Sequence, residues 1–263
     1  MNLDKITVNI PGEGRFGGPW IIAFPWKKLQ LKYGLYGPWK KVSWSGLFDD
    51  YAATRGPKAG LPIITDFAVT LLMNSTVRKK DLETLSTWRE KKRNIQKLIR
   101  LRELVLTVPN MHAANRDVLV SIGKTCNSIL QERDKRGNKI LHGIGIAKLF
   151  KWLSVWAPEH IPMIDSIVYY AVTKQSPKEP YQCEKALCNY QYLLGGKNYK
   201  YLLLLGEKLG HAVLSSKKPI SPVRILENLI WFDYACRWYP YYKNQFRDYI
   251  DFSTWRKHYY SIK

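Results

Sequence analysis

Glycine and proline are unevenly distributed along this chain, and their distribution limits its fold more than any other feature. Residues 1–62 are interrupted repeatedly by both, as in Gly-Gly-Pro at 17–19 and Gly-Pro at 56–57. Such residues prevent long helices, so we expect residues 1–62 to form an irregular extension of loops, turns and short strands packed on the body. The apolar residues that follow recur at helical spacing. Residues 63–263 are therefore predicted to form a helical domain, which makes the protein mostly α.

Three later segments carry the clearest helical patterns. Residues 79–102 combine many Lys and Arg residues with apolar residues three and four apart, which predicts an amphipathic helix pair with a basic outer face. A further helix is expected from Ala114 to about Glu132. Ser221 followed by Pro222 is typical of a helix start, with serine as the N-cap and proline in the first turn.

The net charge of the chain is high and positive. It contains 42 Lys and Arg against 21 Asp and Glu among 263 residues, a formal charge of +21, while 46% of the residues are hydrophobic. A chain this long can bury a real core, and a charge this large predicts a polyanionic partner. A ribosome-associated protein and an anionic-membrane protein are the alternatives. No apolar run of membrane-spanning length and no secretory signal are present, so a cytoplasmic protein without membrane insertion is expected. The protein is also expected to be a monomer.

The four cysteines do not form a recognisable metal or cluster motif. Cys126, Cys183, Cys188 and Cys236 lack both the compact four-thiolate spacing of an iron–sulfur cluster and a Cys-x-x-Cys zinc pair. They are expected to be reduced and buried. The sequence therefore predicts no protein-bound metal or cofactor, apart from a monovalent cation considered below.

The most informative stretch runs from residue 137 to residue 172. Gly143 and Gly145 are separated by one residue and precede an apolar helical pattern, so a tight turn there would open into the first turn of a helix. Backbone N–H groups at such a turn, together with the helix dipole, attract a phosphate. Lys139 and Lys148 flank the turn with positive charge. The hairpin, at about 137–157, is thus predicted to hold a DNA backbone without reading its sequence.

Asp165 lies twenty residues after Gly145, in the context Ile-Pro-Met-Ile-Asp at 161–165, and precedes another apolar helical pattern. This combination of hairpin, interval and Pro-x-x-Asp resembles the helix-hairpin-helix DNA glycosylase superfamily, of which the chain would be a divergent member without an iron–sulfur cluster. The resemblance covers about an eighth of the chain. It implies a two-lobed helical architecture, in which the middle of the chain forms one lobe and both ends form the other. It also implies Asp165, in the segment 158–172, as the catalytic carboxylate, and contacts to double-stranded DNA, with a monovalent cation at the hairpin.

The sequence departs from the pattern of that superfamily at several positions. His142 stands where the family usually has proline, and we count it among the DNA-contacting residues. Ala147 occupies the position of the lysine that forms a Schiff base in strand-cleaving members, whereas Lys148 would point about 100° away around the helix. A monofunctional, hydrolytic enzyme is therefore expected. A bifunctional glycosylase/lyase that uses Lys148 is the alternative.

Asp165 also fits an ordinary structural role, because an aspartate before an apolar helical run is a typical N-cap. The two roles are compatible. Breakage of an N-glycosidic bond builds positive charge on the deoxyribose, so a fixed carboxylate can stabilise the transition state and orient water. If Asp165 is only a cap, the chain is a non-catalytic helix-hairpin-helix DNA-binding module.

An enzyme of this kind must flip the target base out of the duplex into a pocket. Aromatic residues expected to act as pocket walls or as the intercalating wedge are Trp26, Trp39, Trp152 and Tyr169. The expected product is an abasic site. The excised base is predicted to be damaged or modified, and a bulky modified base of phage DNA, removed in antiviral defence, is one hypothesis.

Overall fold

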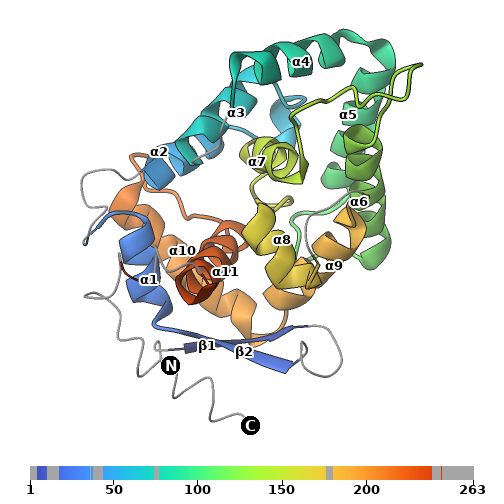
Figure 1. The fold of residues 1–263 in the computed structure, drawn as a ribbon. Helices are drawn as coiled ribbons and strands as arrows, with labels where there is room; N and C mark the ends of the chain where they lie inside the picture. The colour runs from blue at the N-terminus through green and yellow to red at the C-terminus, as the bar shows by residue number, and fades with distance from the viewer. Residues whose placement is uncertain are drawn as a thin grey trace.

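The protein is mostly helical in its computed structural model, which describes residues 5–10, 18–35, 37, 44–73, 77–175, 180–238 and 244 (Figure 1). The elements are, in order, β1 (Lys5–Ile10), β2 (Gly18–Ala23), α1 (Pro25–Lys32), α2 (Trp44–Ala52), η2 (Pro57–Ala59), α3 (Ile64–Val69), η3 (Thr70–Met73), α4 (Lys79–Glu90), α5 (Lys92–Leu106), α6 (Arg116–Leu130), α7 (Ile146–Trp156), α8 (Ser166–Thr173), α9 (Cys183–Leu194), α10 (Lys197–Val213) and α11 (Pro222–Trp238).

The N-terminal region is more ordered than its glycines and prolines predict. β1 and β2 pair antiparallel, from Lys5 opposite Ala23 to Ile10 opposite Gly18, which fits the expected short strands. The helices α1 and α2 were not expected. Pro25 does not block α1, because it stands at the start of the helix. The backbone N–H of a residue in this position has no partner within the helix, so proline loses no hydrogen bond there.

The helical patterns after residue 63 are confirmed. α4 and α5 form the predicted amphipathic pair, separated at Lys91, whose ψ of 125° is not helical. Their apolar faces bury Leu85 and Leu98, while most of their lysines and arginines are exposed. α11 begins as predicted, since the Ser221 hydroxyl accepts a hydrogen bond from the backbone N–H of Arg224 at 3.1 Å.

Segments from both ends of the chain pack together. α1 lies beside α10 and α11, with the two strands below them, whereas α3, α4 and α5 lie at the other side of the molecule (Figure 1). Leu29 of α1 and Leu229 of α11 belong to one hydrophobic core that also contains Leu149 of α7. This arrangement places α7 and the start of α8 between the helices α1, α10 and α11 on one side and the helices α3, α4 and α5 on the other.

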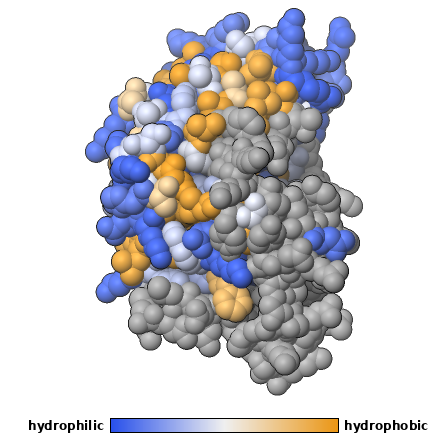
Figure 2. Space-filling model, turned by 90° about the vertical axis from the view of Figure 1, so that its left-hand side faces the viewer, coloured by the Kyte–Doolittle hydropathy of each residue, from blue (hydrophilic) through white to orange (hydrophobic). Residues whose placement is uncertain are grey.

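The surface mixes charged and apolar side chains. The face seen in Figure 2 carries hydrophilic and apolar groups side by side. Leu47 of α2 and Leu71 of η3 are about half exposed. Within the described ranges, no helix is long and apolar enough to cross a membrane. Cys126 and Cys183 are buried free thiols and Cys188 is a half-buried one, whereas the side chain of Cys236 lies outside the described residues.

Candidate active site

Asp165 lies at the N-terminus of α8, as the sequence predicts. Its Oδ1 atom accepts hydrogen bonds from the backbone N–H groups of Ile167 and Val168, both at 2.9 Å. The N-cap role is therefore confirmed. The other carboxylate oxygen accepts no hydrogen bond from any residue that the structure describes. The cap thus fixes the carboxylate and leaves one oxygen for another partner.

Two lysines from distant segments place positive charge near Asp165. Lys32 ends α1, and Lys151 lies in α7 with only 8% of its surface exposed. Burial lowers the pKa of Lys32 to about 8, and Glu227 and Asp165 oppose this decrease electrostatically. Burial also lowers the pKa of Lys151, against the opposing effect of Asp165. Both amines therefore interact electrostatically with the predicted catalytic carboxylate.

α11 and α2 add more buried charges to the same region. The guanidinium of Arg224 contacts the carboxylate of Glu227 and pairs with Asp49, whose Oδ1 lies 3.0 Å from its Nε. Burial raises the pKa of Glu227 to about 7, although Arg224 and Lys32 oppose this increase. The Tyr33 hydroxyl donates a hydrogen bond of 2.5 Å to Asp49.

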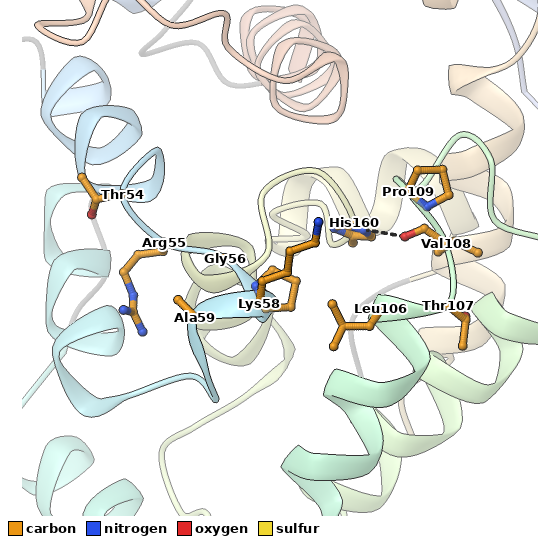
Figure 3. Close-up of a pocket in the computed structure, with 11 residues that line it drawn as sticks. Thr54, Arg55, Gly56, Lys58, Ala59, Leu106, Thr107, Val108, Pro109 and His160 are labelled. Atoms are coloured by element: carbon orange, nitrogen blue, oxygen red, sulfur yellow. Dashed lines mark hydrogen bonds between the residues drawn. The ribbon is translucent and has the colours of Figure 1, made fainter.

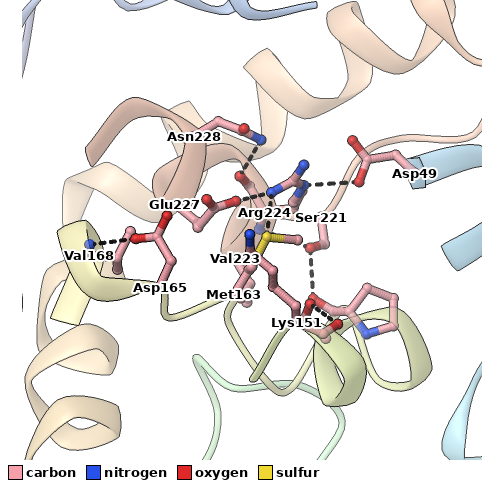
Figure 4. Close-up of polar contacts among 12 residues, drawn as sticks. Asp49, Lys151, Met163, Asp165, Val168, Ser221, Val223, Arg224, Glu227 and Asn228 are labelled. Atoms are coloured by element: carbon pink, nitrogen blue, oxygen red, sulfur yellow. Dashed lines mark hydrogen bonds and ion pairs between the residues drawn. The ribbon is translucent and has the colours of Figure 1, made fainter. Parts of the chain in front are cut away.

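We refer to Lys32, Asp49, Lys151, Asp165, Arg224 and Glu227 together as the charged cluster. Figure 4 shows the members other than Lys32, which converge from several elements, with Arg224 between Asp49 and Glu227, and Asp165 on the other side of Glu227. Removing a charge from water costs several kcal/mol per ion, and apolar side chains of similar size are often more stable in its place. A concentration of buried charges is therefore typical of a functional site.

Local sequence patterns do not reveal the charged cluster beyond Asp165. Its members come from α1, α2, α7, α8 and α11, and only the folded chain brings them together. One local signal existed. Arg224, Glu227 and Asn228 are charged or polar residues within an otherwise apolar helical stretch, and all three are at least 95% buried. Such residues on a buried helix usually have a functional or paired partner.

The predicted hairpin turn is present, and its first glycine is required. Gly143 has a φ of +81°, which side chains other than glycine rarely adopt. A Cβ atom there would also lie 2.7 Å from Oδ1 of Asp81. Gly145 is the N-cap of α7 with a φ of −97°, so its backbone conformation does not require glycine.

Asp81 of α4 fixes the hairpin from the other side. Its Oδ2 atom lies 2.7 Å from Nζ of Lys148 and accepts a 2.9 Å hydrogen bond from the backbone N–H of Arg78. Lys148 is therefore paired with α4. His142 is exposed, and the ammonium of Lys139 lies 5.5 Å from the ring centroid of Tyr181. The hairpin thus presents Lys139 and His142 at or near the surface.

The predicted aromatic residues divide into three groups. Trp152 and Tyr169 are no more than 1% exposed and belong to the core, and their role as pocket walls or wedge stays a prediction. Trp26 is half-buried, with the ammonium of Lys208 4.2 Å from its ring centroid. Trp39 lies outside the described residues.

A separate cavity of about 670 Å³ opens between η2 and the end of α5 (Figure 3). Arg55, Lys58 and His160 are among the residues that line it. Burial lowers the pKa of His160, and Nε2 of its ring lies 3.0 Å from the backbone oxygen of Val108. None of the residues that line this cavity belongs to the charged cluster.

The structure offers no evident metal site among its described residues, where no group of three or more His, Cys, Asp or Glu side chains is placed to hold an ion. Comparisons of the chain with protein-family models, with curated proteins and with solved structures gave no match.

Proposed function

We propose that this protein is a DNA glycosylase of helix-hairpin-helix type, which flips a modified or damaged base out of double-stranded DNA and removes it by hydrolysis. The observation that carries this proposal is the geometry of Asp165. Its carboxylate is fixed by the start of α8, has one oxygen without a hydrogen-bonding partner in the described residues, and lies among buried charges. In the sequence, Asp165 follows the second glycine of the hairpin by twenty residues.

Asp165 has two tasks in this reaction. As the base departs, positive charge develops at C1′ and the ring oxygen of the deoxyribose, and a fixed carboxylate stabilises that charge. The oxygen without a partner can also accept a hydrogen bond from the attacking water and orient it. The N-glycosidic bond breaks, the hydroxyl group of water adds to C1′, the remaining proton of that water ends on the departing base, and an abasic site remains.

The hairpin serves to hold the DNA backbone. Lys139, His142 and the backbone N–H groups around Gly143 and Gly145 would contact phosphates near the target nucleotide. In the two-lobed arrangement that we propose, the hairpin and Asp165 line the cleft between the terminal helices and the middle of the chain, with a monovalent cation bound at the hairpin. The protein would act as a monomer on intracellular DNA, and its large positive charge supports this partner.

Base release tests the proposal directly. The purified protein is incubated with duplexes that carry damaged, mismatched or phage-modified bases, and free base is identified by mass spectrometry while abasic sites are scored by alkali cleavage. Release of one class of base supports the proposal and identifies the substrate. Tight binding of the same duplexes without release of any base would contradict it and favour a non-catalytic DNA-binding module.

A second activity, strand cleavage after base removal, is favoured by the position of Lys151 rather than that of Lys148. A lyase needs a nucleophilic amine close to C1′. Burial lowers the pKa of Lys151, which also interacts electrostatically with Asp165, whereas Lys148 is paired with Asp81. The Lys151 amine would add to the C1′ aldehyde of the abasic sugar with loss of water. Removal of a C2′ proton would then expel the 3′ phosphate.

Borohydride trapping on an abasic duplex distinguishes the two lysines. If Lys151 forms the Schiff base, the wild-type protein and Lys148→Ala are trapped as covalent complexes, whereas Lys151→Ala is not. Absence of trapping in the wild type would contradict the lyase activity and leave the hydrolytic proposal unaffected.

A further inference from the structure

The segment Gly60–Ile63 is fixed to α7 by two tryptophans. The indole N–H of Trp156 donates a 2.8 Å hydrogen bond to the backbone oxygen of Gly60, and that of Trp152 donates an equally long bond to the oxygen of Ile63. Trp152 and Trp156 are four residues apart and therefore lie on one face of α7. The hairpin helix thus holds the segment at both ends.

Asp66 fixes the same segment from α3. Its fully buried carboxylate accepts a 2.8 Å hydrogen bond from the backbone N–H of Ile63. Arg55 contributes two hydrogen bonds to this carboxylate, at 2.7 and 3.1 Å, and the Tyr51 hydroxyl contributes one at 3.0 Å. Both backbone polar groups of Ile63 are therefore hydrogen-bonded, and their partners are themselves held in place.

This rigid support presents an apolar side chain to solvent. Ile63 is 37% exposed and stands at the N-cap of α3, where its own side chain makes no cap hydrogen bond. Serine, threonine, asparagine and aspartate are the usual residues at this position of a helix, because their side chains accept the free N–H groups. The bond from the Ile63 N–H to Asp66 is half of a capping box and stabilises α3, but a capping box does not require an exposed isoleucine at the N-cap.

We propose that Ile63 is the wedge that enters the DNA base stack when the target nucleotide leaves it. This inference rests on the proposed function and names the residue that the aromatic candidates did not supply. Proteins that kink or unstack a duplex insert apolar side chains of this kind between bases, and extrusion of a base leaves a gap that such a side chain can fill. Rigid support is needed because unstacking costs a few kcal/mol, which a mobile side chain would not recover.

The position of Ile63 along α7 agrees with this role. The backbone oxygen of Ile63 accepts a hydrogen bond from Trp152, which directly follows Lys151 in α7. The side chains of Lys151 and Trp152 therefore leave the helix one residue apart along its axis, in directions about 100° apart. The amine of Lys151 interacts with Asp165. The helix α7 thus contacts the segment of Ile63 through Trp152 and carries Lys151 in the charged cluster with Asp165.

A fluorescence measurement tests this role without the natural substrate. The probe is a duplex with one tetrahydrofuran abasic analogue and 2-aminopurine as the adjacent base, whose fluorescence increases when it loses its stacking partner. At saturating wild-type protein we expect a clear increase. Ile63→Ala and Ile63→Thr should reduce that increase to less than about a quarter, because neither side chain fills the gap, and Ile63→Leu should restore it. Leu203→Ala removes a similarly exposed side chain, 43% exposed on α10, and should behave as wild type.

An unchanged fluorescence increase with Ile63→Ala or Ile63→Thr would overturn the proposal, as would wild-type protein that gives no increase at saturation. The probe contains no base to excise, so its result does not depend on catalysis. Failure of the glycosylase proposal would appear separately, as DNA binding and unstacking without release of any base.

Discussion

Glu227 is 2% exposed and lies among charges of both signs on α11. Burial raises its pKa to about 7. In the unfolded chain the group has its ordinary pKa near 4.5, so it loses its proton at lower pH there than in the folded protein. As the pH rises from about 4.5 to 7, this residue therefore decreases the free energy of unfolding.

Replacement of Glu227 by Gln removes this titration and keeps the side chain nearly the same size. Between about pH 4.5 and pH 7 we expect the stability of Glu227→Gln to rise relative to the wild type, by up to about 3 kcal/mol, since one pKa unit corresponds to about 1.4 kcal/mol. Urea denaturation across this pH range measures the difference. A constant difference between the two proteins would show that the folded-state pKa of Glu227 is not raised.

At the scale of elements, the sequence predicts the helices whose position depends on local spacing and capping residues. The α4–α5 pair, α6 and the start of α11 follow from helical spacing and capping residues, as do the turn at Gly143 and the helix start at Asp165. The helix α1 was missed because Pro25 was interpreted as a breaker. The charged cluster was missed because it depends on tertiary contacts, such as the hydrogen bond between Asp49 and Arg224, 175 residues apart.

Substitutions at two glycines distinguish the cost of backbone strain from the cost of a clash with Asp81. Gly143 and Gly137 have φ values of +81° and +79°, but only a side chain at Gly143 would meet Asp81, since nothing lies within 4 Å at Gly137. Gly137→Ala should cost about 1 kcal/mol from backbone strain alone. Gly143→Ala should cost about 1–3 kcal/mol more, because a buried ion pair is displaced, and it should also weaken DNA binding. Denaturation and binding assays check both; equal losses would contradict the role of Asp81.

At the scale of the whole molecule, the charge of +21 predicts DNA binding that depends steeply on salt. If Lys139 contacts a phosphate, Lys139→Ala should weaken binding equally for all sequences and reduce the slope of log K against log salt by about 1. Lys200→Ala removes an exposed charge on α10 and should change the slope less. Equal slopes for Lys139→Ala and the wild type would exclude a phosphate contact by Lys139.

The central claim is that Asp165 is the catalytic carboxylate and more than a helix cap. Asparagine caps a helix about as well as aspartate, so Asp165→Asn should keep the fold and DNA affinity while it loses the negative charge. Asp134→Asn, in an exposed turn before the hairpin, is the matched control. The decisive measurement is the single-turnover rate of base release. We predict a decrease of at least about a hundredfold for Asp165→Asn and none for Asp134→Asn; equal rates for Asp165→Asn and the wild type would contradict the claim.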